Sequence, residues 1–375
     1  MVQPLSLWLV VLVATGLTCM LTTLLAGLLL LAERFLVNYG PCAIDINSGD
    51  RQLTVEGGQT LLAALKSEGI FIPSACGGRG TCAYCKLKIT DGAGPLLPTE
   101  EPLLTKDEIA ADVRISCQVK VRNDLKINIP QELFSIREYR GVVKRIRDLT
   151  HDIKELRIAL TEPETLEFSA GQYIQLQAPA YDKSPESVYR AYSMSNPPDD
   201  NRAVETIIRL VPGGICTTWV FRYLTEGDEI AFSGPYGEFR LSETDNEMVW
   251  IAGGSGMSPF WSMIRHMKTA GIERKTTYFF GAVAKRDLFF VDELTELADE
   301  LPWFEFIPAL SAPADGDHWT GETGLITEIV NRHVTAGRND LEAYLCGSAG
   351  MIDAACKVLA DKGITEDRIF YDKFN

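Results

Sequence analysis

The first 32 residues of the chain contain no charged side chain, and residues 5–32 are apolar or small almost throughout. At a helical rise of about 1.5 Å per residue, such a segment exceeds the roughly 30 Å hydrocarbon thickness of a bilayer, so it can span one with tilt. A secretory signal peptide would have a basic start and a shorter apolar region. A core helix of a soluble protein would keep a polar side. The pattern therefore predicts a single transmembrane anchor within residues 1–34, with membrane contact through residues 5–32.

Residues 35–131 mix two periodicities. Alternating segments such as AIDIN and RQLTVEG are typical of strands. Between them and a glycine-rich loop, TLLAALKSEG has a helical pattern, which Thr60 can cap at its start and Gly69 can end. This combination predicts a small α+β domain.

The pattern changes twice more along the chain. Residues 132–242 contain short β segments separated by turn signals, which is typical of an antiparallel barrel or sandwich. Residues 243–375 alternate apolar strands with helices, which predicts a doubly wound α/β domain with a parallel sheet. The chain is therefore predicted to be a multidomain protein with one anchor and three further domains.

Composition narrows the possible partners. The 36 basic and 51 acidic residues give a net charge of −15 without a basic run, which argues against nucleic-acid binding. Beyond the four cysteines discussed next, the remaining cysteines are scattered and suggest no disulfide framework, so a reducing compartment is expected. These are Cys19, Cys42, Cys216, Cys346 and Cys356.

Cys76, Cys82, Cys85 and Cys117 have the spacing C-x5-C-x2-C-x31-C, and the first three lie in a glycine-rich loop. Three thiolates from one tight loop and a fourth from a distant strand are typical of an iron–sulfur cluster. A zinc site would instead favour two C-x2-C pairs or Cys/His pairs. Only one C-x2-C is present, and no histidine lies between residues 1 and 150. We therefore predict that these four cysteines hold a [2Fe–2S] cluster.

Two motifs in the barrel region suit a flavin nucleotide. In RAYS, Arg190 can pair with a phosphate, Tyr192 can stack on a planar heterocycle and Ser193 can hydrogen-bond a ring nitrogen. In GGICTT, residues 213–218, glycines open a helix that has hydroxyls in its first turn, which builds an anion site. Each motif is short, and an ordinary strand end or helix start remains an alternative for either one.

The α/β region contains two further glycine motifs. The strand MVWIA runs into GGSGMSP, residues 253–259, and then into a helix, which is the context of a dinucleotide site although the pattern is not GxGxxG. Cys346 and Gly347 end a later strand, AYLCG. In a doubly wound sheet the carboxyl ends of strands line the ligand crevice, so both motifs should face one cleft. An inert core thiol is the alternative for Cys346.

In this order, RAYS, GGICT, GGSGMSP and LCG resemble the ferredoxin-NADP reductase superfamily. Together with the anchor, the cysteine spacing, the LPTE turn at 97–100 and RISCQVKVRNDLKINIP, nearly the whole chain resembles the F-subunit family of the sodium-translocating NADH:quinone reductases. The resemblance implies a β-grasp [2Fe–2S] ferredoxin domain at 35–131, an antiparallel β-barrel FAD domain at 132–242 and an α/β NADH domain at 243–375.

The same resemblance implies an NADH:acceptor oxidoreductase. Hydride from NADH would reduce FAD, and single electrons would pass to the cluster and on to integral membrane subunits of a quinone-reducing, ion-translocating complex. Quinone would be reduced only through those partners. The chain would be a single-pass protein of the bacterial inner membrane with its soluble domains in the cytoplasm. Because residues 5–32 of the anchor contain no charged residue, ion translocation is not expected of this chain itself.

Individual roles also follow from the resemblance. Arg190 would bind the FAD pyrophosphate, Tyr192 would pack on the isoalloxazine, and Ser193 would hydrogen-bond near N5. Cys346 would lie near the nicotinamide, and Phe374 would shield the flavin. The other implied binding residues are Ala191, Gly214, Ile215 and Thr217 for FAD, and Gly253, Gly254, Gly256, Pro259 and Gly347 for NADH. Ser193, Cys346 and Phe374 are the expected catalytic residues.

Some positions depart from the family. Val283 stands where the family has an arginine, and Ser348 and Ala349 stand where it has two prolines. Lys285 and Arg286 could meet the 2′-phosphate of NADPH. Three alternatives remain: an NADH-dependent reductase component of a multicomponent oxygenase, which is normally soluble; a membrane-tethered electron carrier without NADH turnover; and a zinc-binding adaptor.

Overall fold

The computed structural model describes residues 5–36, 39–74, 76–338 and 340–374. Residues 1–4 of the predicted anchor region lie outside the described residues. The chain divides into two compact units, one made of residues 1–72 and 83–133 and the other of residues 73–82 and 134–375. Residues 73–82, which include Cys76 and Cys82, therefore belong to the second unit although they lie within the ferredoxin-like stretch of the sequence.

The N-terminal segment forms one helix, α1 (Leu5–Leu36). Its stretch Trp8–Leu29 has a mean hydropathy of 2.2 and is long and apolar enough to cross a membrane. Thr15, Thr18 and Thr23 each donate a hydroxyl hydrogen bond to the carbonyl four residues earlier, at 2.6–2.7 Å. These bonds give the three hydroxyl groups an acceptor within the helix, which an apolar environment does not supply.

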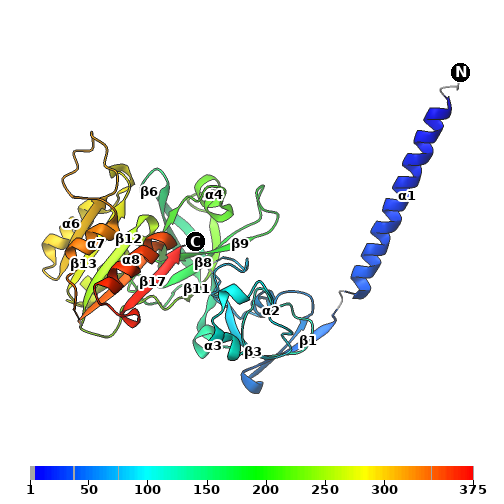
Figure 1. Cartoon of the computed structure of the whole chain (residues 1–375), viewed down its shortest axis with the longest axis horizontal. Helices are drawn as coiled ribbons and strands as arrows, with labels where there is room; N and C mark the ends of the chain where they lie inside the picture. Colours follow the sequence, from blue (N-terminus) through cyan, green and yellow to red (C-terminus); the bar gives the residue numbers. More distant parts are fainter. Residues whose placement is uncertain (1–4, 37–38, 75, 339, 375) are drawn as a thin grey trace. The chain divides into compact units, whose positions relative to one another are not determined.

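The first unit also contains a five-stranded mixed sheet (Figure 1). Its order is β2-β1-β5-β3-β4, with β1 parallel to β5 and every other pair antiparallel. The strands are β1 (Pro41–Ile46), β2 (Arg51–Glu56), β3 (Lys86–Asp91), β4 (Val113–Ile115) and β5 (Leu125–Asn128), and the helices are α2 (Leu61–Ser67) and α3 (Lys106–Ala110). As predicted, Thr60 caps α2, because its side chain accepts a hydrogen bond from the Ala63 N–H.

The second unit contains a six-stranded antiparallel sheet of order β10-β7-β6-β11-β8-β9. A bridge between Met194 and Thr206 links the segment after β9 to β10, which brings the two edges together as a barrel. Helix α4 (Ile215–Arg222) packs against β8 and β9. The strands are β6 (Arg137–Asp148), β7 (Ile153–Glu162), β8 (Tyr173–Ala178), β9 (Val188–Ser193), β10 (Ala203–Arg209) and β11 (Glu229–Tyr236).

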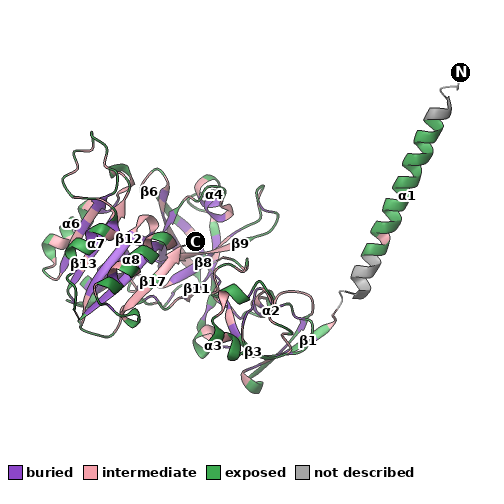
Figure 2. Ribbon diagram, viewed as in Figure 1, coloured by how far each residue is buried: buried purple, intermediate pink, exposed green. Residues whose placement is uncertain are grey.

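A six-stranded parallel sheet of order β15-β14-β13-β12-β16-β17 follows. Its central strands are buried on both faces (Figure 2). Trp250 and its even-numbered neighbours face a core with α5 and α6, whereas Ile251 and its odd-numbered neighbours face α7 and α8. The elements are β12 (Glu247–Gly253), α5 (Met257–Ala270), β13 (Thr276–Ala282), α6 (Val291–Glu300), β14 (Phe304–Leu310), β15 (Glu322–Thr323), α7 (Ile326–His333), β16 (Leu341–Ser348), α8 (Ala349–Asp361) and β17 (Ile369–Phe374).

The strand order reverses between β12 and β16. In open α/β sheets this switch point forms the crevice in which ligands bind, outside the carboxyl ends of the strands. GGSGMSP follows β12, and Cys346 and Gly347 lie near the end of β16. Both predicted NADH motifs therefore flank the switch point.

Candidate functional site

The four predicted cluster cysteines occur as two pairs. In the second unit, the Cys76 N–H donates to the Cys82 sulfur at 3.4 Å, and hydrogen bonds from Cys82 and Thr81 lower the pKa of Cys76 to about 3. In the first unit, Cys85 and Cys117 are both buried, and their mutual hydrogen bond together with burial raises the pKa of Cys85. Across the described residues, no group of three or more His, Cys, Asp or Glu side chains is arranged to hold a metal ion.

The surroundings of the cysteines fit an iron–sulfur cluster. Thiols are the donor atoms that such clusters use. Gly77, Gly78 and Gly80 have φ of 67°, 84° and 74°, a backbone region that glycine adopts without strain and that lets the loop curl. Beside Cys85, the hydroxyl of Ser116 is buried and has no hydrogen-bond partner in the part of the chain that is described. A buried donor without an acceptor fits a site in which the sulfur atoms of a bound cluster would accept the hydrogen bond.

The loop of residues 73–82 packs on strand β9. A Cβ atom at Gly77 would collide with the guanidinium of Arg190 and the carbonyl of Tyr189. Gly77 is thus restricted both by its positive φ and by close approach of a neighbouring backbone. The contact brings the cysteine loop to the strand that contains RAYS.

The RAYS residues lie on β9, next to helix α4. Tyr192 and Arg190 share one face of the strand, and Tyr192 packs against the barrel core beside Cys216 of α4. Desolvation and the neighbouring Cys216 raise the pKa of Tyr192, while burial raises the pKa of Cys216 to about 11. The structure therefore brings the two predicted flavin motifs together.

Gly214 is the residue before α4, at the position that the sequence predicted for a phosphate site. A Cβ at Gly214 would lie 2.6 Å from the Thr217 hydroxyl. That hydroxyl accepts a hydrogen bond from the Val211 N–H at 3.2 Å. Ile215 begins the helix, and its carbonyl accepts a hydrogen bond from the Tyr181 hydroxyl at 2.6 Å. These two hydrogen bonds hold the first turn of α4 in place.

The two NADH motifs contact each other through their backbones. A Cβ at Gly256 would collide with the Cys346 carbonyl and would lie 3.0 Å from Cα of Gly347. A Cβ at Gly347 would lie 3.4 Å from the Gly253 carbonyl, and Gly347 has φ of 147°. Gly256 needs to be glycine because the turn after β12 closely approaches the backbone at the end of β16, and Gly347 is favoured as glycine by its positive φ.

Ser193 connects the barrel to the α/β domain. Its carbonyl accepts a hydrogen bond from the Ser258 hydroxyl of GGSGMSP at 2.6 Å. Its own hydroxyl lies 3.4 Å from the Asp372 carboxylate on β17. Phe374, at the end of the same strand, packs against the core that contains Cys346. RAYS, the NADH motif and the C-terminal strand therefore meet at one serine.

Sequence reasoning missed Ser258 and Asp372. Ser258 lies within the GGSGMSP motif, but the sequence alone does not indicate which group accepts the hydrogen bond of a serine in the first turn of a helix. Asp372 lies two residues before Phe374, and strand pairing puts it beside Cys346. The alternation of YDKFN was the available signal, because residues two apart in a strand share a face.

The positions that depart from the family lie around the carboxyl edge of the sheet. Val283 follows β13 and is 59% exposed. Ser348 precedes α8 and Ala349 begins it, positions where proline is also compatible with a helix start, so the helix forms without the prolines. Lys285 donates to the Asp317 carbonyl at 3.0 Å.

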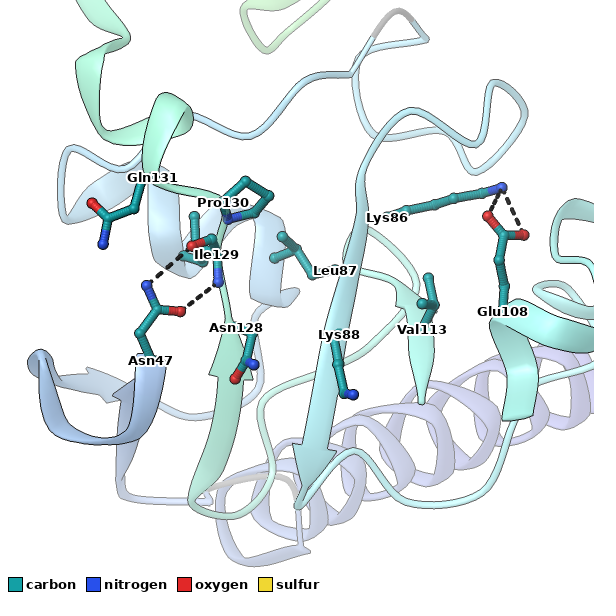
Figure 3. Close-up of a pocket in the computed structure, with 10 residues that line it drawn as sticks. All are labelled: Asn47, Lys86, Leu87, Lys88, Glu108, Val113, Asn128, Ile129, Pro130 and Gln131. Atoms are coloured by element: carbon teal, nitrogen blue, oxygen red, sulfur yellow. Dashed lines mark hydrogen bonds and ion pairs between the residues drawn. The ribbon is translucent and has the colours of Figure 1, made fainter. Parts of the chain in front are cut away.

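A separate groove of about 570 Å³ lies on the first unit (Figure 3). Lys86 and Glu108 form an ion pair of 2.7 Å at one side, and Asn47 exchanges two hydrogen bonds with the Ile129 backbone at the other. None of the predicted site residues lines this groove. It is therefore distinct from the proposed cofactor positions.

Three family models match successive parts of the chain. A 2Fe-2S iron-sulfur cluster binding domain matches residues 44–122, an oxidoreductase FAD-binding domain matches residues 140–241, and an oxidoreductase NAD-binding domain matches residues 250–357. These matches confirm the predicted cofactors, an iron–sulfur cluster, FAD and a nicotinamide nucleotide.

Curated relatives resemble the chain over nearly its full length. The F-subunit of the Na(+)-translocating NADH-quinone reductase of Neisseria meningitidis is 36% identical, over 93% of this chain and 96% of that protein. The proteins of the same name from Klebsiella pneumoniae and Pseudomonas aeruginosa are 34% and 35% identical, over 95% and 93% of this chain and 97% and 95% of their own lengths.

Solved structures confirm the predicted fold class. A cytochrome P450 reductase from Amycolatopsis has a TM-score of 0.72 at 29% identity, and 89% of this chain and 98% of that chain are covered. A ferredoxin reductase in carbazole 1,9a-dioxygenase has a TM-score of 0.68 at 25% identity, with the same coverage.

Proposed function

Because the chain belongs to the F-subunit family of the Na(+)-translocating NADH-quinone reductases, we propose that it carries electrons from NADH through FAD to a [2Fe–2S] cluster. FAD supplies the exchange between two-electron hydride transfer and one-electron transfer, which the nicotinamide and the cluster cannot make by themselves. The residues of this chain bind, orient and shield these groups.

The junction at Ser193 is the observation that carries the proposal. Its hydroxyl belongs to RAYS, and its carbonyl is fixed by Ser258 of the NADH motif at 2.6 Å. This hydrogen bond joins β9 to the GGSGMSP motif, so a displacement of either segment would also displace the other. With FAD bound, the Ser193 hydroxyl would hydrogen-bond near N5. Cys346 would lie near the nicotinamide and Phe374 would shield the flavin, and Phe374 packs against the core that contains Cys346. We assign these three as the catalytic residues.

The binding roles are assigned by motif. Arg190 would pair with the FAD pyrophosphate, because its guanidinium is the fixed positive charge of this strand. The ring of Tyr192 would pack on the isoalloxazine. Ala191, Gly214, Ile215 and Thr217 complete the FAD site, and Gly253, Gly254, Gly256, Pro259 and Gly347 shape the NADH site.

The cluster is assigned to Cys76, Cys82, Cys85 and Cys117. Two thiol pairs and a loop of left-handed glycines support this assignment. We place the domain boundaries after residues 34, 131 and 242.

The electron acceptors are integral membrane subunits of a quinone-reducing, ion-translocating complex. Helix α1 supports attachment to a membrane, and because its residues 5–32 contain no charged side chain, ion binding is left to the partners. We propose that the chain spans the bacterial inner membrane once and that its cofactor domains lie in the cytoplasm, where NADH is available.

The test uses the full chain in detergent. Anaerobic NADH should bleach the flavin absorption and then produce the electron paramagnetic resonance signal of a reduced [2Fe–2S] cluster. Ser193→Ala should slow flavin reduction about a hundredfold, the scale of losing one positioned donor, with FAD still bound. Ser195→Ala is the matched control, since its buried hydroxyl has no partner among the described atoms. The proposal fails if NADH leaves the flavin oxidised.

A second candidate is the reductase component of an oxygenase system. The Amycolatopsis and carbazole-dioxygenase reductases, which cover 89% of this chain, favour it. Co-purification from solubilised membranes separates the two functions. Integral membrane redox subunits travelling with the chain support the quinone-reductase assignment, whereas a soluble oxygenase as the bound partner supports the second.

A further inference from the structure

We propose that Ser116 and Gln118 tune the reduction potential of the cluster by donating hydrogen bonds to the sulfurs of Cys85 and Cys117. The inference rests on the cluster ligands assigned above. All four residues belong to the first compact unit. Neither Ser116 nor Gln118 is a ligand, so their effect on the cluster is one of positioning and electrostatics.

The backbone places the Ser116 side chain beside Cys85. Lys86 pairs with Ile115 in the antiparallel ladder of β3 and β4, so Cys85 and Ser116 are the next opposite residues. The Ser116 N–H donates to the Cys85 carbonyl at 2.9 Å. Opposite residues of an antiparallel pair direct their side chains to the same face, with Cβ atoms about 5 Å apart. The Ser116 hydroxyl therefore lies on the same side as the Cys85 sulfur.

The Ser116 hydroxyl lacks an acceptor. Ser116 is 0% exposed, and its Oγ has no partner with hydrogen-bond geometry in the described chain. A buried hydroxyl without a partner is unfavourable. A negatively charged cluster sulfur would supply the missing acceptor.

Gln118 acts on the next ligand. Its Nε2 lies 3.6 Å from the Cys117 sulfur and 3.5 Å from the Cys117 carbonyl. Sulfur is large, so hydrogen bonds to it are long. Cys117 is buried and Gln118 is half-buried, so the amide of Gln118 lies between solvent and the Cys117 sulfur.

Both donors should favour the reduced cluster. Reduction adds a negative charge that is shared by iron and sulfur, and hydrogen bonds to charged acceptors are stronger than those to neutral ones. Hydrogen bonds to the sulfurs are among the factors that set cluster potentials. The two side chains therefore raise the potential and make the cluster a better acceptor of electrons from the flavin.

The test is a redox titration of the cluster in the purified full chain, followed by electron paramagnetic resonance. We expect Ser116→Ala and Gln118→Met each to favour the oxidised cluster about tenfold, which is about 59 mV for one electron. The double variant should shift further than either. Matched controls are Ser67→Ala and Gln59→Met in the same unit, because these side chains donate to backbone carbonyls at 2.8 and 3.3 Å and not to sulfur.

Iron content and visible absorption show that each variant still holds its cluster. An unchanged potential in Ser116→Ala and Gln118→Met with an intact cluster overturns this inference alone. Equal shifts in the two controls also overturn it, since the effect would not depend on the sulfur contacts. An unaltered chain whose four cysteines bind no iron overturns both this inference and the proposed cluster.

Discussion

Replacing Gly256 with alanine directly tests the close approach between the turn after β12 and the end of β16. Gly256 is buried, and its φ of −61° is one that alanine adopts without strain. The expected damage is therefore steric and not conformational. The added Cβ would meet the Cys346 carbonyl and the Cα of Gly347, which are backbone atoms and not the movable end of a side chain.

The surrounding sheet limits how far the backbone can yield. Cys346 is paired with Ala252 on one side and with Asp372 on the other, so β16 is held between two neighbours. Overpacking of a well-packed site costs about 1–3 kcal/mol. The upper end, about 3 kcal/mol, is expected here because backbone must move, and it should lower the thermal midpoint by about 10 °C for a unit of this size.

The assay pairs thermal unfolding with NADH kinetics. Gly256→Ala should lower the midpoint and raise the KM for NADH at least tenfold, while FAD and iron contents stay unchanged. Gly350→Ala is the control, because Gly350 lies in α8 with no atom within 4 Å of the added Cβ, and alanine favours a helix. A Gly256→Ala protein with the midpoint and the KM of the unaltered chain would refute the steric reasoning.

Three further outcomes are expected. Burial alone would raise the pKa of Glu342, but hydrogen bonds from its neighbours lower it from 4.5 to about 2. The stabilisation that ionised Glu342 contributes is therefore complete above pH 4.5 and is lost as the pH falls towards 2. Urea unfolding across this range should show the loss, and Glu342→Gln should remove that part of the pH dependence. Glu205 is 4% exposed and forms ion pairs with three arginines. Glu205→Gln should therefore destabilise the chain by about 3 kcal/mol in a thermal melt. Glu164→Gln, in an exposed ion pair, should change the stability little. Gly77→Ala should reduce the iron content of the purified chain, and Gly94→Ala, with a similar φ of 70° but open space, should reduce it less; equal iron in both variants would contradict the packing of this loop on β9.

The periodic parts of the fold could be predicted from the sequence. The barrel, the parallel sheet and helix α2 follow from alternation, from strand–helix order and from a capping threonine, which are local signals. The glycine turns after β12 and at Gly347 could also be placed, because only strand ends in a doubly wound sheet bring such turns together.

The contacts of the site could not be predicted, because they depend on register between distant segments. Ser193 lies 65 residues from Ser258 and 179 from Asp372 along the chain. A shift of one residue in β17 would direct Asp372 to the other face. Likewise, no local signal distinguishes Ser116, and only the hydrogen bond from its N–H to the Cys85 carbonyl, next to the β3–β4 ladder, makes its hydroxyl relevant.

The packing of Gly77 on Tyr189 and Arg190 has a consequence for how such reductases diversify. A ferredoxin-like module exchanged between relatives would bring its own loop residue at position 77, and any side chain there would meet the carbonyl of the recipient's β9. Exchange of the module therefore has to keep a glycine or remodel the strand at the same time. We expect position 77 and the strand residues 189–190 to vary together across related chains. The ferredoxin-like domain could then not be exchanged independently of the barrel strand, even though a domain boundary separates them in the sequence.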